Sequence, residues 1–238
     1  MVPSSFGLLA AGNVDWLEVA LVIVLLVLSL GVHEAAHAWS AWKLGDSTAK
    51  DLGRMTINPI VHIDPFMTII LPAMCALVGA PIFGGAKPVP VNMNRLRNPW
   101  LDMGVVAFAG PLSNLLLACL FFALWKFFVA TGYYNGAAEL MSGRYDQLLP
   151  RVMLSSMSFN VVLFVFNLIP IPPLDGSRIL VNLLPQSMRE SYTSLGRFGL
   201  LIVFFVINYV GPAQMLLRST RLQVIHLVEK VVTLGGAW

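Results

Sequence analysis

Charged side chains are scarce in this sequence. Asp, Glu, Lys and Arg make up only 11% of its 238 residues, whereas hydrophobic residues make up 57%. A soluble globular domain usually carries about 25% charged residues. The shortage of charge, together with a mean hydropathy of +0.77, argues against an ordinary soluble domain and predicts a membrane protein. The length allows about five or six membrane segments of roughly 20 residues each.

Cysteine and clustered positive charge are also scarce. The two cysteines, Cys75 and Cys119, lie within apolar segments and form no CxxC pair. We interpret them as small core residues that indicate no oxidising compartment. The net charge is +3, but the basic residues are scattered between apolar runs. They form no patch with interleaved aromatic residues, so we expect no nucleic-acid partner and interpret them as determinants of membrane topology.

The N-terminus lacks the basic residues of a secretion signal. Residues 1–15 contain no Lys or Arg, and the apolar run from Trp16 to Leu30 continues directly into a histidine-containing stretch. We therefore expect a retained helix rather than a cleaved signal peptide. This helix should reach about Trp42 and stop near Gly45.

Later apolar runs alternate with polar loops. Residues 66–80 are short for a span and contain proline and glycine, which favours a re-entrant loop. Further helices are expected at residues 103–130, with an interruption at Gly110-Pro111, and at residues 148–169, 198–210 and 213–232. Short strands are expected between Thr48 and Asp64. The expected fold is an all-α polytopic membrane protein with about five or six membrane helices or segments. Short strand-like or re-entrant segments should lie near the functional site.

The distribution of Lys and Arg predicts the orientation of these segments. Three polar segments share an excess of basic residues: residues 43–54, 87–97 and 178–197. Residues 1–16 have none, and residues 131–147 have one. Because Lys and Arg favour the cytoplasmic side, we expect the three basic segments inside and residues 131–147 outside.

One short motif carries the strongest chemical signal. His33-Glu34-Ala35-Ala36-His37 places two imidazoles at i and i+4, on one face of a helix, where both can bind one metal ion. The glutamate beside them can take a proton from a water molecule that zinc activates. Charged groups in an apolar helix cost roughly 2.5 to 3.5 kcal/mol each, so three clustered ionisable groups indicate a common purpose. The simpler alternative is that the histidines only form hydrogen bonds between helices.

A catalytic zinc usually has three protein ligands and one open position, so a third ligand is expected elsewhere in the chain. The candidates are His62, Asp64, Asp102, Asp175 and His226. Asp175 is favoured because it follows an apolar run in a proline-rich turn, where the prolines supply no backbone donors. The alternative is that Asp175 caps the next helix. For His62 the alternative is an ordinary loop histidine, and His226 is expected to be interfacial.

Three motifs together resemble the site-2 protease family of intramembrane zinc metalloproteases. They are the HExxH helix, Gly110-Pro111-Leu112-Ser113-Asn114, and the run from Asn167 to Gly176, with the sequence NLIPIPPLDG. Two further stretches resemble a compact prokaryotic branch of that family, Asn58 to Pro65 and Lys87 to Asn92. The resemblance extends over about residues 17–180.

The resemblance implies one zinc ion bound by His33, His37 and Asp175, with Glu34 as the general base. It implies cleavage of a transmembrane helix of a membrane-protein substrate, as in regulated intramembrane proteolysis. It also implies a multi-pass protein surrounded by lipid in a prokaryotic cell membrane, with an active site that opens toward the cytoplasm. We hypothesise that extended segments at residues 48–63 or 82–92 offer an edge to the unwound substrate.

The same resemblance suggests that Asn114 and Asn167 line the site and bind the substrate backbone or the oxyanion. The alternative is that both only join helices through hydrogen bonds. Gly110 is interpreted as a position of close helix packing beside a kink at Pro111.

The domain organisation is expected to be simple. A single membrane-embedded domain should occupy residues 1–238, with a catalytic core at about 17–180 and C-terminal helices at about 194–238. We expect no PDZ or CBS domain, and the C-terminal quarter contains no motif. The residues leave the oligomeric state open, including a homo-oligomer.

Other functions remain open on the residues alone. A membrane zinc hydrolase of a lipid or a non-peptide amide would use the same site. A non-catalytic metal-binding or transport protein would leave Glu34 without a role, and the inverted repeats that transporters often show are absent from the sequence. Two histidines and a carboxylate could also hold non-haem iron, although the base within the HExxH motif favours zinc.

Overall fold

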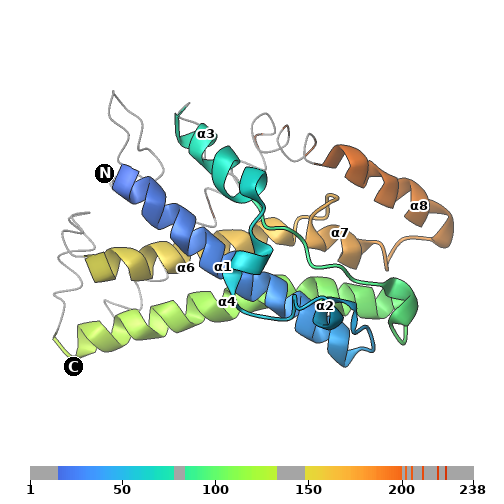
Figure 1. Ribbon diagram of the computed structural model, residues 1–238, viewed down its shortest axis with the longest axis horizontal. Helices are drawn as coiled ribbons and strands as arrows, with labels where there is room; N and C mark the ends of the chain where they lie inside the picture. Colours follow the sequence, from blue (N-terminus) through green and yellow to red (C-terminus); the bar gives the residue numbers. More distant parts are fainter. Residues whose placement is uncertain are drawn as a thin grey trace.

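The computed structural model describes residues 16–77, 84–132 and 148–199, and a few isolated positions beyond them. Every regular element in these three ranges is a helix (Figure 1). The all-α prediction is therefore confirmed for the described part of the chain. The predicted helices at residues 198–210 and 213–232, and the loop at 131–147, lie almost wholly outside the described residues.

The first helix, α1, runs from Trp16 to Lys43. Its 28 residues span about 42 Å at 1.5 Å per residue. Gly45 follows with a φ of +113°, a conformation that glycine adopts without steric cost and that reverses the chain. The expected end of this helix near Gly45 is confirmed.

Helix α4 runs from Pro99 to Ala130 and continues through Pro111. The predicted interruption at Gly110-Pro111 is wrong. Proline removes one backbone hydrogen bond, but a long apolar helix tolerates that loss where neighbouring helices enclose it. Both α1 and α6 pack against α4. At its N-terminus, the Asp102 carboxylate accepts a hydrogen bond from the Asn98 N–H at 2.8 Å.

Two of the described helical segments, Ile23–Lys43 and Pro99–Ala130, are long and apolar enough to cross a membrane. Helix α6, Leu148–Asn167, contributes a shorter apolar stretch. In Figure 1, α4 runs antiparallel to α1 and α6, which lie against it. A core cluster joins α4 to α6 and consists of Ala118, Trp125, Met153 and Met157. Neighbouring helices in this described part of the chain therefore alternate in direction.

Short elements connect the long helices. Between α1 and α4 lie α2 (Thr48–Asp51), η1 (Pro59–His62), η2 (Pro65–Ile70), α3 (Leu71–Leu77) and η3 (Met93–Arg95). After α6 come α7 (Asp175–Leu180), α8 (Gln186–Ser194) and η4 (Leu195–Phe198).

The strands expected between Thr48 and Asp64 are not formed, and that prediction is wrong. Side chains in this stretch cap helical turns instead. The Asn58 side chain accepts from the Ile60 N–H, and the Asp64 carboxylate accepts from the N–H groups of Phe66 and Met67. These local acceptors stabilise turns where a strand would need a neighbouring strand.

The segment of residues 84–92, here called the extended segment, runs along the C-terminal half of α1. Val89 is buried against Ala38 and Ala49. At the far end, the Asp46 carboxylate accepts from the Asn92 N–H at 2.6 Å. Burial alone would raise the pKa of the Asp46 carboxyl, but hydrogen bonds from Thr48 and the Asn92 N–H outweigh it and hold that pKa below its usual value.

Candidate metal centre

The HExxH motif lies in the C-terminal half of α1. His33 and His37 are buried, at 4% and 8% exposed, and their rings project from the same side of the helix. Ser29 lies one turn earlier and is buried as well. The spacing of four residues brings these three polar side chains onto one stripe facing the helix bundle.

Helix α4 presents a matching stripe of Val106, Gly110 and Asn114, again four residues apart and all buried. A Cβ atom on Gly110 would collide with the His37 ring and would come within 2.7 Å of His33 Cε1. Gly110 therefore leaves the space that the two imidazoles occupy. The sequence predicted close packing at this glycine, and the structure shows that its neighbours are the histidines themselves.

Asp175 reaches the histidines from the turn that follows α6. It is the first residue of α7, and Leu174 precedes it as the N-cap without a side-chain hydrogen bond. At Gly176 a Cβ atom would collide with the main chain of Leu168 and Ile169. The glycine lets the turn fold tightly against the end of α6, and the carboxylate is thereby directed toward α1.

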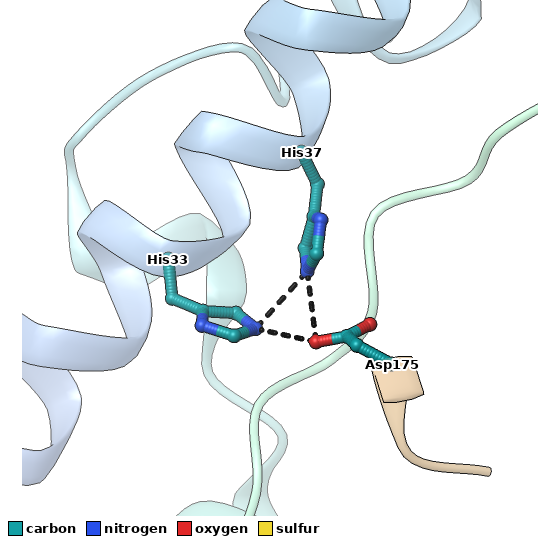
Figure 2. A group of neighbouring side chains, drawn as sticks. All are labelled: His33, His37 and Asp175. Carbon is teal, nitrogen blue, oxygen red and sulfur yellow. Dashed lines mark hydrogen bonds and ion pairs between the residues drawn. The ribbon is translucent and has the colours of Figure 1, made fainter. Parts of the chain in front are cut away.

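The three side chains converge on one point (Figure 2). Asp175 Oδ2 lies 3.1 Å from His33 Nε2 and 3.3 Å from His37 Nε2. The two Nε2 atoms are 3.0 Å apart. Among the described residues, these three form the group of His, Cys, Asp or Glu side chains whose ligand atoms lie close enough together to hold one metal ion. The carboxylate of Asp175 contacts the two imidazoles, which argues against its reading as a simple helix cap.

Hydrogen bonds to the opposite ring nitrogens determine the tautomers. His33 Nδ1 lies 2.6 Å from Asn114 Oδ1, and His37 Nδ1 lies 2.7 Å from the Val106 carbonyl oxygen. Both oxygens only accept, so both Nδ1 atoms carry the proton and donate. In neutral imidazoles the Nε2 atoms then have free lone pairs directed at each other and at the Asp175 carboxylate. Three such acceptors this close together require a proton or a metal cation between them.

The donor set fits zinc. A tetrahedral zinc ion with ligands about 2.0–2.1 Å away separates neighbouring donor atoms by about 3.3–3.4 Å. The observed separations of 3.0 to 3.3 Å are close to that value. Two imidazoles whose second nitrogens donate to fixed oxygens are typical of zinc ligands.

Glu34 is also buried, at 8% exposed. Its Oε2 atom accepts a hydrogen bond of 2.7 Å from the Val89 N–H in the extended segment. Pro88 and Pro90 flank this residue and have no N–H. Val89 is therefore the main-chain donor that this stretch can direct at the carboxylate.

The other candidate ligands that the structure describes lie in different surroundings. His62 Nε2 lies 3.0 Å from the Thr56 carbonyl oxygen. Asp64 and Asp102 cap helices, as described above. His226 lies outside the described residues. Only Asp175, among the described candidates, joins the two histidines.

The two asparagines differ in position. Asn114 contacts His33, as given above, whereas Asn167 donates to the Leu163 carbonyl of its own helix at 3.0 Å. A substrate-binding role for either remains a prediction. Sequence reasoning overlooked Asn160, which is fully buried and hydrogen-bonds to Asn114. A polar amide within the apolar stretch of α6 was the available signal.

Comparison with known proteins gives consistent results. The sequence matches the family model described as "Peptidase family M50" over residues 21–208. It is 41% identical over 190 residues to "Putative zinc metalloprotease YwhC" of Bacillus subtilis (strain 168), with 80% of each chain covered. It is 31% identical over 195 residues to "Putative zinc metalloprotease Rip2" of Mycolicibacterium smegmatis, with 81% of this chain and 68% of the relative covered. No solved structure matches.

Proposed function

This chain belongs to peptidase family M50, and on that premise we propose that it cleaves a peptide bond within or next to a transmembrane helix of another membrane protein. The chain is a zinc-dependent metalloendopeptidase. One observation carries the finer proposal. His33 and His37 lie on α1 within Ile23–Lys43, a segment apolar enough to cross a membrane, and Asp175 joins them from the start of α7.

We propose that His33, His37 and Asp175 would hold the metal, with room for water or substrate as a further ligand. Zinc bound there would supply a Lewis acid, which would lower the pKa of a bound water to about 7 and polarise the scissile carbonyl. Both histidines must stay neutral to keep a lone pair on Nε2. The acceptors on their Nδ1 protons, Asn114 and the Val106 carbonyl, support that state.

Glu34 is the proposed general base. It takes a proton from the attacking water and later gives it to the leaving amine. The Val89 N–H holds one carboxylate oxygen, which leaves the second oxygen to carry the proton. A carboxylate that transfers a proton twice has to stay in one position during both steps. This hydrogen bond restrains the Glu34 side chain.

The surface of α4 supports a lipid environment. Its outward side carries large apolar residues at helical spacing, namely Leu101, Val105, Phe108, Leu112, Leu116, Leu120, Leu124 and Phe127. Its inward side is mostly apolar too, apart from Asp102 and Asn114, so the helix is hydrophobic on most of its surface, as in a membrane span. A peptide bond that reaches a site on α1 has to enter among such helices, which favours a substrate that is itself a membrane helix.

We propose that the site opens toward the cytoplasm. Basic residues from separate parts of the chain gather beyond the C-terminal end of α1. The Arg54 guanidinium donates to the carbonyl oxygens of Lys87 and Pro88, and Arg95 lies 3.7 Å from Asp51. Lys and Arg are enriched on the cytoplasmic side of membrane proteins. A multi-pass arrangement with this end inside agrees with that rule.

The idea that the substrate pairs with an extended edge of the enzyme needs revision. Residues 48–51 and 59–62 form helical turns. In the extended segment, the main-chain groups of residues 87–89 already bond to His62, Arg54 and Glu34. Pairing of a substrate strand at these positions would first have to break those bonds.

Co-expression with a panel of single-span membrane proteins tests the proposal. The parent chain should shorten at least one of them, and Glu34→Gln should reduce the cleavage rate by about 10²–10⁴-fold. The substitution keeps an oxygen for the Val89 N–H, so zinc and fold should be retained. Glu190→Gln, an exposed glutamate on α8, is the matched control.

Two outcomes would contradict the proposal in different ways. Cleavage by Glu34→Gln at the parental rate, with zinc bound, would overturn the assigned mechanism. Cleavage of lipid or small-amide substrates with every membrane protein left intact would retain the hydrolase and replace the substrate class.

A further inference from the structure

A buried chain of hydrogen bonds leads from His33 into the interface between α4 and α6. His33 Nδ1 lies 2.6 Å from Asn114 Oδ1, and Asn114 Nδ2 donates to Asn160 Oδ1 at 2.8 Å. Asn160 Nδ2 donates in turn to Ser29 Oγ at 2.9 Å and to the Ser156 carbonyl oxygen at 2.8 Å. Asn114 and Asn160 are both fully buried. The chain begins at a proposed metal ligand and ends at a main-chain group one turn back along α6.

The main-chain end determines the direction of every bond in this chain. A carbonyl oxygen only accepts, so the Asn160 amide must present its nitrogen to Ser156. Its oxygen then points to Asn114, which must present nitrogen in return. The Asn114 oxygen is left for His33, whose Nδ1 has to carry the proton. The hydroxyl of Ser29 can accept or donate, so it does not determine the orientation of the Asn160 amide. The Ser156 carbonyl determines that orientation.

We propose that Asn160 is a positioning residue that acts through Asn114 to hold His33 in the tautomer whose Nε2 can bind zinc. This inference rests on the proposed role of His33 as a zinc ligand. Asn114 alone would not secure the tautomer, because an amide that rotates by half a turn presents nitrogen instead of oxygen. The bond from Asn114 Nδ2 to the Asn160 oxygen opposes that rotation.

His37 shows why such a device is needed at His33. The acceptor for His37 Nδ1 is the Val106 main-chain carbonyl, which cannot exchange oxygen for nitrogen. The acceptor for His33 is the side-chain amide of Asn114, which can exchange oxygen for nitrogen by rotating. Asn160 prevents the Asn114 amide from rotating. The Asn114 oxygen therefore stays directed at His33, just as the Val106 carbonyl stays directed at His37.

A double-mutant cycle on zinc affinity tests the proposal. The purified full-length chain in detergent is titrated with zinc against a competing chelator, for the parent, Asn114→Ala, Asn160→Ala and the double variant. Loss of an outer partner of a zinc ligand typically weakens binding about 10–100-fold. We expect Asn114→Ala in that range and Asn160→Ala at about tenfold, near its lower end. In the Asn114→Ala background, Asn160→Ala should add little.

Ser156→Ala is the matched control. The Ser156 Oγ atom is buried without a hydrogen-bond partner, whereas its carbonyl makes the bond to Asn160. Removing the hydroxyl leaves the carbonyl in place, so zinc affinity should stay at the parental value. Asn160→Asp should recover much of the affinity lost in Asn160→Ala, because a protonated carboxyl offers one donor for the Ser156 carbonyl and an acceptor for Asn114, and the Ser29 hydroxyl can donate to it.

Three results separate the explanations. Additive losses in the two asparagine variants, or no loss in Asn160→Ala, would overturn the proposal. If Asn160→Ala fails to fold, the zinc affinity of Asn160→Asp tests the proposal instead. An Asn160→Asp affinity as low as that of Asn114→Ala would contradict it. Full zinc binding by His33→Ala would instead disprove the proposed metal site.

Discussion

The proposed metal ligands and the proposed general base are held by different parts of the molecule. Helices α1, α4 and α6, with the start of α7, position His33, His37 and Asp175 through buried side chains and close helix packing. The extended segment positions Glu34 through a single main-chain N–H. The difference indicates that metal binding and proton transfer depend on separate supports, so substitutions should be able to damage one and spare the other.

The two parts also differ in what makes them rigid. In the helices, side chains four residues apart on α1 pack against side chains four residues apart on α4. Gly110 provides the space for the imidazoles. In the extended segment, Pro88 and Pro90 restrict the backbone around Val89. Arg54 and Asp46 then tie the segment to neighbouring turns.

The largest effect is expected from removal of a metal ligand in the helical part. His33→Ala, His37→Ala and Asp175→Ala should each reduce bound zinc from about one per chain to a small fraction, because a catalytic site has three protein ligands. Metal analysis of the purified proteins measures this, with Asp51→Ala as an exposed control. Full zinc in Asp175→Ala would mean that another residue is the third ligand, with His62 the next to test.

A smaller but still severe effect is expected from Gly110→Ala. Its methyl group would displace the imidazoles, so zinc content and activity should both fall sharply. Gly104→Ala on the same helix is the matched control, since its added methyl meets the amide end of Asn182, a side chain that can move. Equal zinc loss in both variants would show that general helix packing, rather than the contact with the histidines, is responsible.

Val89→Pro tests the other part of the comparison. It removes the N–H that donates to Glu34, and a hydrogen bond to a charged group contributes about 1.5–3 kcal/mol. We expect the cleavage rate to fall about 10–100-fold while zinc content stays unchanged. Val89→Ala keeps the N–H and should retain most activity. Zinc loss in Val89→Pro would show that the two supports are not separate.

The smallest effect concerns the anchor of the extended segment. Asp46→Asn weakens the bonds to Thr48 and the Asn92 N–H, so thermal stability at neutral pH should fall modestly. Because the folded state lowers the pKa of Asp46, its contribution is fully present above the unfolded pKa of about 3.9 and is lost as the pH falls through the lower folded pKa. Melting temperatures from pH 7 to pH 3 should therefore converge for the parent and Asp46→Asn. A constant difference would assign the effect to packing.

Several parts of the structure were predictable because their causes are local. The run of apolar residues predicts α1, and Gly45 predicts where it ends. Membership of the site-2 protease family, predicted from three motifs, is confirmed by the match to peptidase family M50.

The strands near residues 48–64 were predicted wrongly because the caps at Asn58 and Asp64 have the stronger effect. The break at Pro111 was predicted wrongly because packing by α1 and α6 does not appear in a one-dimensional pattern.

Which residue types share one helix face follows from the order of the residues alone. His33 and His37 lie together because an α-helix repeats about every 3.6 residues. Which groups bond to His33, His37 and Glu34 depends on how the helices and the extended segment pack together. The bonds of His33 to Asn114, of Asn114 to Asn160 and of Glu34 to Val89 join residues 81, 46 and 55 positions apart. No periodicity links such distant positions, because their meeting depends on how closely whole helices approach, and at Gly110 that approach depends on the absence of a single methyl group.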